Sequence, residues 1–231
     1  MLRRMHASAR RFGSTGAARR LAVALVATVF AIAACTTATP SEPTGSPAGA
    51  SEGTPQTLWP APPNPLELTV AAGLEAEATE ELEFHVHAHL DVFVDGRPVE
   101  VPAGIGINTA DPEVKIDDEP DGSKRYAGIT LCAQPCISPL HTHAHYGIIH
   151  TESATPTQST LGQFFIEWGV TLTGSCVGEY CSPDKPIEIY VDGVKTTQDP
   201  STIELSDMRE IAIIIGTRPP FIPTTADFSK I

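Results

Sequence analysis

The chain has 231 residues, and its 28 acidic residues against 15 lysines and arginines give it a formal net charge of −13. A surface of this sign repels nucleic acid and anionic lipid, so neither is expected as a partner of the folded surface, whereas cations are attracted. A high net charge also keeps an exported protein soluble, which is the simpler explanation of the excess. Seven of the eight histidines fall in two short segments, and bulk composition does not explain that arrangement.

Residues 1–34 have the composition of a signal peptide. Six arginines and no acidic residue precede an apolar run at 21–34, which is too short for a permanent membrane-spanning helix. The arginine pairs leave open whether export uses the general secretory route or the twin-arginine route. Removal of this segment leaves nine basic residues against 28 acidic ones, a formal net charge of −19.

The apolar run ends in "IAAC" at residues 32–35, which resembles the lipobox of bacterial lipoproteins. The resemblance implies cleavage before Cys35, lipidation of the Cys35 sulfur and amino group, and anchoring to the extracytoplasmic face of the cell membrane. A secretory signal with a chance cysteine is the alternative. Residues 35–65 are rich in proline, serine, threonine, glycine and alanine and predict a flexible linker, which leaves 66–231 as one globular domain.

A strand is predicted at 82–94, where apolar and polar residues alternate. The three histidines of this strand fall on one face together with Asp91, while the apolar residues between them face the other way. The dipeptide "DG" at 95–96 predicts a tight turn, and "RPVEVPAG" supplies the returning strand.

Residues 110–128 form an acidic segment that partly matches a calcium-binding loop. Pro120 stiffens the segment, and Gly128 stands where a calcium loop places its bidentate glutamate. The segment is therefore predicted to be a solvated surface loop.

Four cysteines lie outside the signal region, in "CAQPC" and "CVGEYC". An even number of cysteines outside the cytoplasm predicts disulfides, and four cysteines allow three pairings. The simplest pairing closes the two local loops, and a zinc site built from all four thiolates is the alternative, which an oxidising compartment disfavours. These cysteines are Cys132, Cys136, Cys176 and Cys181.

A helix is predicted to begin at Thr160, where Gln163 completes a capping box, and to end at Gly169. Its apolar stripe has helical spacing and is expected in the core; it consists of Leu161, Phe164, Phe165 and Trp168. The run "REIAIIIGT" at 209–217 is too apolar for an exposed strand and is expected in the middle of the sheet. These elements predict a mainly β (α+β) fold, a single sandwich-like or open-sheet domain with one or two helices.

The two histidine segments, "HVHAHLD" and "HTHAHYGIIHTE", predict a metal site. Histidines at i and i+2 of a strand lie about 7 Å apart on one face, so a pair can reach one ion and the second segment must supply further ligands. Imidazole favours zinc or copper over calcium and magnesium, and a mature chain with Met208 as its single methionine does not suit a thioether-rich cuprous carrier. The expected ligands are His85, His87, His89, His141, His143 and His150, with Glu152 and Asp91 as oxygen ligands or as acceptors for the rings.

The order of these motifs, "HVHAHLDVFVDG" followed by "PLHTHAHYGIIHTES", resembles an exported domain of uncharacterised bacterial lipoproteins, and this resemblance implies no activity. The sequence predicts a surface-tethered protein that captures, buffers or transfers zinc or copper. Two alternatives stay open: a metal-dependent enzyme in which Glu152 or Asp91 acts as base, and an interaction module whose histidines respond to pH. His145 lies at a turn and is left outside the ligand set, and no protein partner is indicated.

Overall fold

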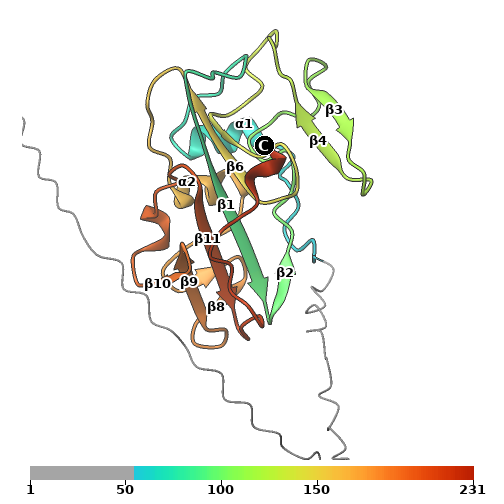
Figure 1. Ribbon diagram of the computed structural model, residues 1–231. Coiled ribbons are helices and arrows are strands. Elements are labelled where there is room, and N and C mark those ends of the chain that lie inside the picture. Colours follow the sequence, from blue (N-terminus) through green and yellow to red (C-terminus); the bar gives the residue numbers. More distant parts are fainter. Residues whose placement is uncertain (1–54) are drawn as a thin grey trace, which may run out of the picture. The chain divides into compact units, whose positions relative to one another are not determined.

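The computed structural model describes residues 55–231 (Figure 1). The predicted signal peptide, Cys35 and most of the predicted linker lie outside these residues. The described chain is mainly β with two α-helices and an open sheet, so the predicted fold class is confirmed. Between residues 55 and 231, no helix combines the length and the apolarity that crossing a membrane requires.

The main sheet has seven strands, six of them in the order β10-β9-β11-β1-β6-β5, and β2 pairs with β1 off this path. The long strand β1 runs parallel to β11 and antiparallel to β6 and β2. The strands are β1 Phe84–Val94, β2 Arg97–Val99, β5 Leu140–His141, β6 Ile148–Ser153, β9 Ile187–Val191, β10 Val194–Thr196 and β11 Arg209–Ile215. Because β11 lies between β9 and β1 and is buried beyond its first residue, its predicted central position is confirmed.

Shorter elements surround the sheet. They are the α-helices α1 Pro65–Ala71 and α2 Leu161–Trp168, the 3-10 helices η1 Pro200–Thr202 and η2 Phe228–Lys230, and the ribbons β3 Lys115–Asp118 with β4 Lys124–Ala127 and β7 Cys176–Val177 with β8 Tyr180–Cys181. The segment predicted as an acidic loop therefore contains a hairpin, β3–β4. Its turn is stabilised by Asp121, whose carboxylate accepts from the Ser123 backbone N–H at 2.9 Å, and the β3 residues are exposed as expected.

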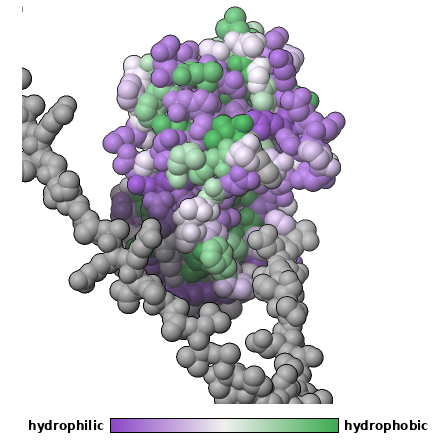
Figure 2. Space-filling view, viewed as in Figure 1, coloured by the Kyte–Doolittle hydropathy of each residue, from purple (hydrophilic) through white to green (hydrophobic). Residues whose placement is uncertain are grey.

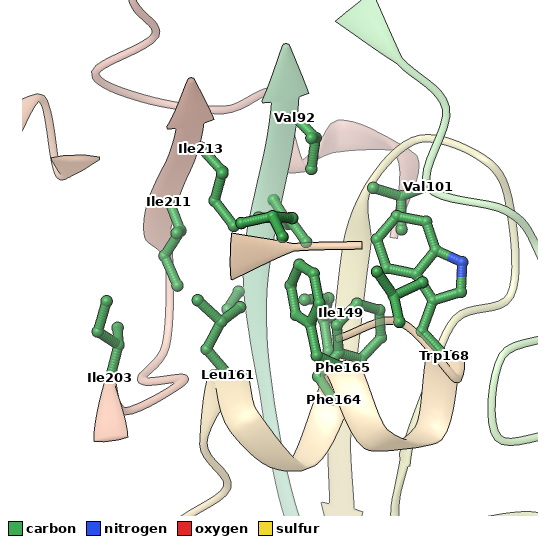
Figure 3. Packing of buried hydrophobic residues seen from close by; sticks show 14 of the residues in the cluster. Val92, Val101, Ile149, Leu161, Phe164, Phe165, Trp168, Ile203, Ile211 and Ile213 are labelled. Carbon is green, nitrogen blue, oxygen red and sulfur yellow. The ribbon is translucent and has the colours of Figure 1, made fainter. Parts of the chain in front are cut away.

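The hydrophobic core lies on one face of the main sheet, under α2 (Figure 3). The capping box of α2 is present, with Thr160 accepting from the Gln163 backbone, and Gly169 ends the helix at φ 71°, where a side chain would be strained. The predicted apolar stripe of α2 is buried against Val92, Ile211 and Ile213 of the sheet. Since side chains alternate along a strand, this packing turns His85, His87 and His89 to the opposite face.

Both predicted disulfides are present, Cys132–Cys136 and Cys176–Cys181. Each closes a short loop within one segment of the chain. Because all four sulfurs are bonded in pairs, the alternative of a zinc site built from four thiolates is wrong.

The chain joins the domain before the predicted boundary at residue 66. The Gln56 backbone N–H donates to the Pro98 carbonyl at 2.9 Å, beside β2 and the carboxyl end of β1. Trp59 packs edge-on against Trp168, with ring centroids 5.8 Å apart, and accepts a hydrogen bond from the Trp168 indole at 2.9 Å. These contacts attach the end of the proline-rich segment because it carries apolar side chains that the core covers.

The surface is mixed in character. Figure 2 shows a face on which hydrophilic residues are interspersed with separate apolar patches. Exposed apolar side chains include Val70, Leu131 and Phe221, which come from three different parts of the chain.

Candidate metal centre

Three neighbouring strands bring the two histidine segments together. In the ladder, His150 of β6 lies opposite His87 of β1 on one side and opposite His141 of β5 on the other. Two positions along the ladder, Glu152 lies opposite His85 on the same face. Residues directly opposite in a sheet share a face, so these side chains meet on the face that α2 leaves uncovered.

The first set of converging side chains is the inner group, which consists of His141, His143, His150 and Glu152. All four are buried, with exposed fractions of at most 6%. One nitrogen or oxygen atom from each lies within 4.8 Å of the others. His141 is the last residue of β5 and His143 lies two residues further along, so this short segment supplies two ligands to the group.

The spacing of the inner group matches that of donors around one ion. The Nε2 atoms of His141 and His143 are 3.3 Å apart, and Nδ1 of His150 is 3.2 Å from Oε1 of Glu152. The same Glu152 oxygen is 3.8 Å from Nε2 of His141. Two ligands of a tetrahedral zinc ion, each about 2.0 Å from the metal, lie about 3.3 Å apart.

The hydrogen bonds behind the rings fix which nitrogens are available. Nδ1 of His141 is 2.8 Å from the Ser138 carbonyl, and Nδ1 of His143 bonds the Tyr126 carbonyl. A carbonyl oxygen only accepts, so both Nδ1 atoms carry hydrogen, and in neutral rings both Nε2 atoms present bare lone pairs. Two lone pairs therefore face each other at 3.3 Å. A cation between them removes the repulsion.

The second set is the outer group, which consists of His85, His87 and His150. Nε2 of His85 is 3.5 Å from Nδ1 of His150 and 2.9 Å from Oε1 of Glu152. The outer group opens toward solvent, because the His85 side chain is 32% exposed. Two buried atoms at the centre, Nε2 of His87 and Oε2 of Glu152, have no hydrogen-bond partner among the described residues.

Two further acidic residues from the chain before β1 border the centre. Oε1 of Glu80 is 3.7 Å from Nε2 of His143. Burial, and then the charges of Glu80 and Glu77, raise the pKa of Glu152 to about 8. Burial likewise raises the pKa of Glu77 to about 7, with Glu81 adding to the shift.

The pKa values of the imidazoles shift in the opposite direction, below their usual range. Burial lowers the pKa of His143 to about 4, and burial and the neighbouring rings lower the pKa values of His141 and His150 well below the usual range. Without a cation, the rings and the carboxyl of Glu152 are therefore all neutral at pH 7. The close contact between His85 and Glu152 is then a hydrogen bond and not an ion pair.

The structure places His89 and Asp91 apart from both groups. Nδ1 of His89 is 2.8 Å from Oε2 of Glu210, and its Nε2 is 2.8 Å from the Tyr146 carbonyl. Asp91 lies beside this pair, with Oδ2 3.8 Å from Nδ1 of His89, and one ligand atom from each of the three residues lies within 4.8 Å of the others. Burial lowers the pKa of His89, but the hydrogen bond and charge of Glu210 outweigh it and raise the pKa overall. Since both ring nitrogens have protein partners, we leave His89 out of the proposed ligand set.

His145 also lies elsewhere. Its Nε2 is 3.2 Å from a carboxylate oxygen of Asp121, at the turn of the β3–β4 hairpin. Because His145 lies outside the centre, its substitution can serve as a control for substitutions of the histidines inside it.

Glu77, Glu80, Asp207 and Glu210 lie near the histidines and were not expected there from the sequence. The Asp207 carboxylate accepts from the His87 backbone N–H at 3.2 Å. Glu210 is the only acidic residue inside the apolar run of β11, and that isolated charge was a usable signal. Glu77 and Glu80 belong to the acidic stretch "EAEATEELE", in which nothing local distinguishes the residues that face the centre.

Comparisons of the chain with protein-family models, with curated proteins and with solved structures give no match in any of the three.

Proposed function

We propose that this domain binds one divalent transition-metal ion, zinc or copper, through His141, His143, His150 and Glu152. The observation that carries the proposal is the pair of Nε2 atoms of His141 and His143. Backbone carbonyls hold both rings with their lone pairs facing each other at 3.3 Å. A buried arrangement of this kind is unfavourable alone and favourable around a cation.

The donor chemistry selects the class of metal. Three imidazole nitrogens and one carboxylate oxygen suit zinc or cupric ion, whereas calcium and magnesium prefer oxygen ligands alone. The four cysteines of the described residues are bonded as disulfides, so thiolate donors for a soft ion such as cuprous copper are not supplied there.

Binding is supported over catalysis by the number of donors. Catalytic zinc sites keep one position for water, with three protein ligands, whereas four protein donors complete a tetrahedral ion. The inner group supplies four buried donors. We therefore propose capture, buffering or transfer of the metal as the role of this centre.

The proposed setting is the outer face of the cell membrane, where the lipid on Cys35 holds the chain. Its support is the "IAAC" motif after an arginine-rich, apolar segment. The two disulfides agree with an oxidising compartment outside the cytoplasm.

Elemental analysis of the purified full chain, together with its thermal unfolding with and without added zinc or cupric ion, tests the proposal. We expect about one equivalent of bound metal and a rise in unfolding temperature, because a ligand that binds only the native state stabilises it. The variant His143→Ala should bind the metal more weakly and show a smaller rise in unfolding temperature, and His145→Ala, the matched control outside the centre, should match the wild type. Trace metal in the wild-type chain with no thermal shift would end the proposal.

A further inference from the structure

The inner and outer groups share one ring, that of His150. Its Nδ1 faces both groups, at 3.2 Å from Oε1 of Glu152 and at 3.5 Å from Nε2 of His85. One ring nitrogen has a single lone pair and ligates a single ion. An ion held through this nitrogen by the inner group therefore excludes a second ion held through it by the outer group.

The two groups differ in their access to solvent. All four residues of the inner group are buried. In the outer group, His150 is buried, His87 is intermediate and His85 is exposed. An ion arriving from solvent thus meets the β1 pair before it reaches the buried donors.

Side chains of the two groups are in direct contact with one another. The rings of His87 and His150 are in edge contact, with centroids 4.6 Å apart, and the His150 and His143 rings are 4.4 Å apart. Oε1 of Glu152 is within 2.9 Å of Nε2 of His85 in the outer group and within 3.8 Å of Nε2 of His141 in the inner group. Ligands can therefore be exchanged one at a time, without release of the ion to water.

We propose that the centre offers two mutually exclusive positions to one metal ion, an outer loading position at His85, His87 and His150 and an inner retaining position at His141, His143, His150 and Glu152. This inference rests on the proposed function, because it assigns a direction of loading and release to the same metal centre. The loading position presents exposed imidazole to the solvent and so suits exchange with another imidazole- or carboxylate-bearing carrier of the same ion. No redox change accompanies the transfer.

The test uses zinc as the probe and the full chain. Zinc is titrated in competition with a chromophoric chelator to give stoichiometry and affinity, and its release to excess chelator is followed in time. The double variant His85→Ala/His87→Ala alters the outer group alone, His141→Ala/His143→Ala alters the inner group alone, and His145→Ala is the control. Thermal unfolding of each metal-free variant verifies that it is folded, and His85→Ala, at an exposed position, gives a milder outer variant.

The wild-type chain should bind one equivalent. The outer double variant should load and release zinc more slowly by about tenfold or more, with an affinity that changes much less, because a ligand on the path affects both rates. The inner double variant should fall in affinity by about 100-fold or more and exchange its remaining zinc rapidly.

Three results would overturn the two-position inference while leaving metal binding intact. They are simultaneous binding of two equivalents, wild-type exchange rates in the outer variants, and loss of tight binding from the outer variants. Failure of the wild-type chain to bind zinc or cupric ion would instead overturn the proposed function itself.

Discussion

His87 and His89 lie two residues apart on the same face of β1, yet they have opposite surroundings. His87 faces His150 of β6, and its Nε2 has no partner among the described residues. His89 lies opposite Glu210 of β11, and both of its nitrogens are hydrogen bonded. The register of β11 with β1 begins at Ala88, so only the later histidine has a β11 neighbour. The role of each histidine is therefore set by the adjacent strand and not by its own spacing.

The first way to test this comparison is to remove the ring that both groups share. His150→Ala should lower the affinity for zinc by at least about 100-fold, more than the loss of an outer hydrogen-bond partner usually costs. Competition titration against a chelator measures it. Tight binding by His150→Ala would show that the inner and outer groups do not depend on this ring.

The second test removes His89. His89→Ala should leave zinc affinity nearly unchanged but lower the free energy of unfolding of the metal-free chain by up to about 3 kcal/mol, because it removes a hydrogen-bond partner of the buried Glu210 side chain. Urea unfolding measures the loss. The control His145→Ala, which removes a partly exposed ring, should change stability by about 0.5 kcal/mol or less. A large loss of zinc affinity in His89→Ala would return this residue to the ligand set.

The third test contrasts Glu152 with a buried carboxyl on the core side. Glu167 of α2 accepts from the hydroxyls of Ser138 at 2.6 Å and Thr69 at 3.1 Å, and burial raises its pKa to about 7 from 4.5. Between pH 4.5 and about 7, the folded chain keeps a proton on Glu167 that the unfolded chain has lost. The stability that the neutral Glu167 side chain gives is therefore complete below pH 4.5 and is lost as the pH rises through about 7. Glu167→Gln cannot ionise, so it should be more stable than the wild type at pH 8 by roughly 2–3 kcal/mol. Urea unfolding at pH 5 and pH 8 measures the difference, and equal pH dependence of the two chains would contradict it.

The smallest effect is expected at the far edge of the sheet, where a carboxylate has cationic partners. Hydrogen bonds from Arg218 and Lys195 lower the pKa of Glu188 to about 2. Because this pKa is lowered, the stability that the ionised Glu188 carboxylate gives is present above pH 4.5 and is lost as the pH falls through about 2. Because the Arg218 side chain is 57% exposed, Arg218→Ala should cost only about 0.5 kcal/mol at pH 7. Urea unfolding at pH 7 and pH 2.5 compares the wild type with Arg218→Ala. If Arg218→Ala lost as much stability at pH 2.5 as at pH 7, the loss would not come from the ion pair with Glu188.

Local patterns were sufficient for much of the fold. Alternation along 82–94 gave β1 and the face of its histidines, the capping box and apolar stripe gave α2, and short cysteine spacing gave both disulfides. Each of these features depends on residues close in sequence. The central position of β11 followed from its uninterrupted apolar run.

Features that depend on contacts between distant parts of the chain were not predicted from the sequence. The parallel pairing of β11 with β1, which separates His89 from the other histidines, joins residues 121 positions apart and leaves no local trace. Glu80 approaches His143 through a loop whose path depends on the rest of the domain. The β3–β4 hairpin was missed because acidic composition concealed the turn chemistry of Asp121, Gly122 and Ser123.

The attachment of Gln56 beside β2 has a consequence for where the linker joins the domain. Gln56 meets the domain next to Val99, which pairs with Val92 near the carboxyl end of β1, whereas His85 and His87 are near the amino end. Val92 and His85 are seven residues apart along β1, which corresponds to about 23 Å at the usual rise of a strand. In the proposed setting, with Cys35 lipidated, the linker would therefore enter the folded domain at a point remote from the solvent-facing His85, whatever orientation the domain takes relative to the membrane.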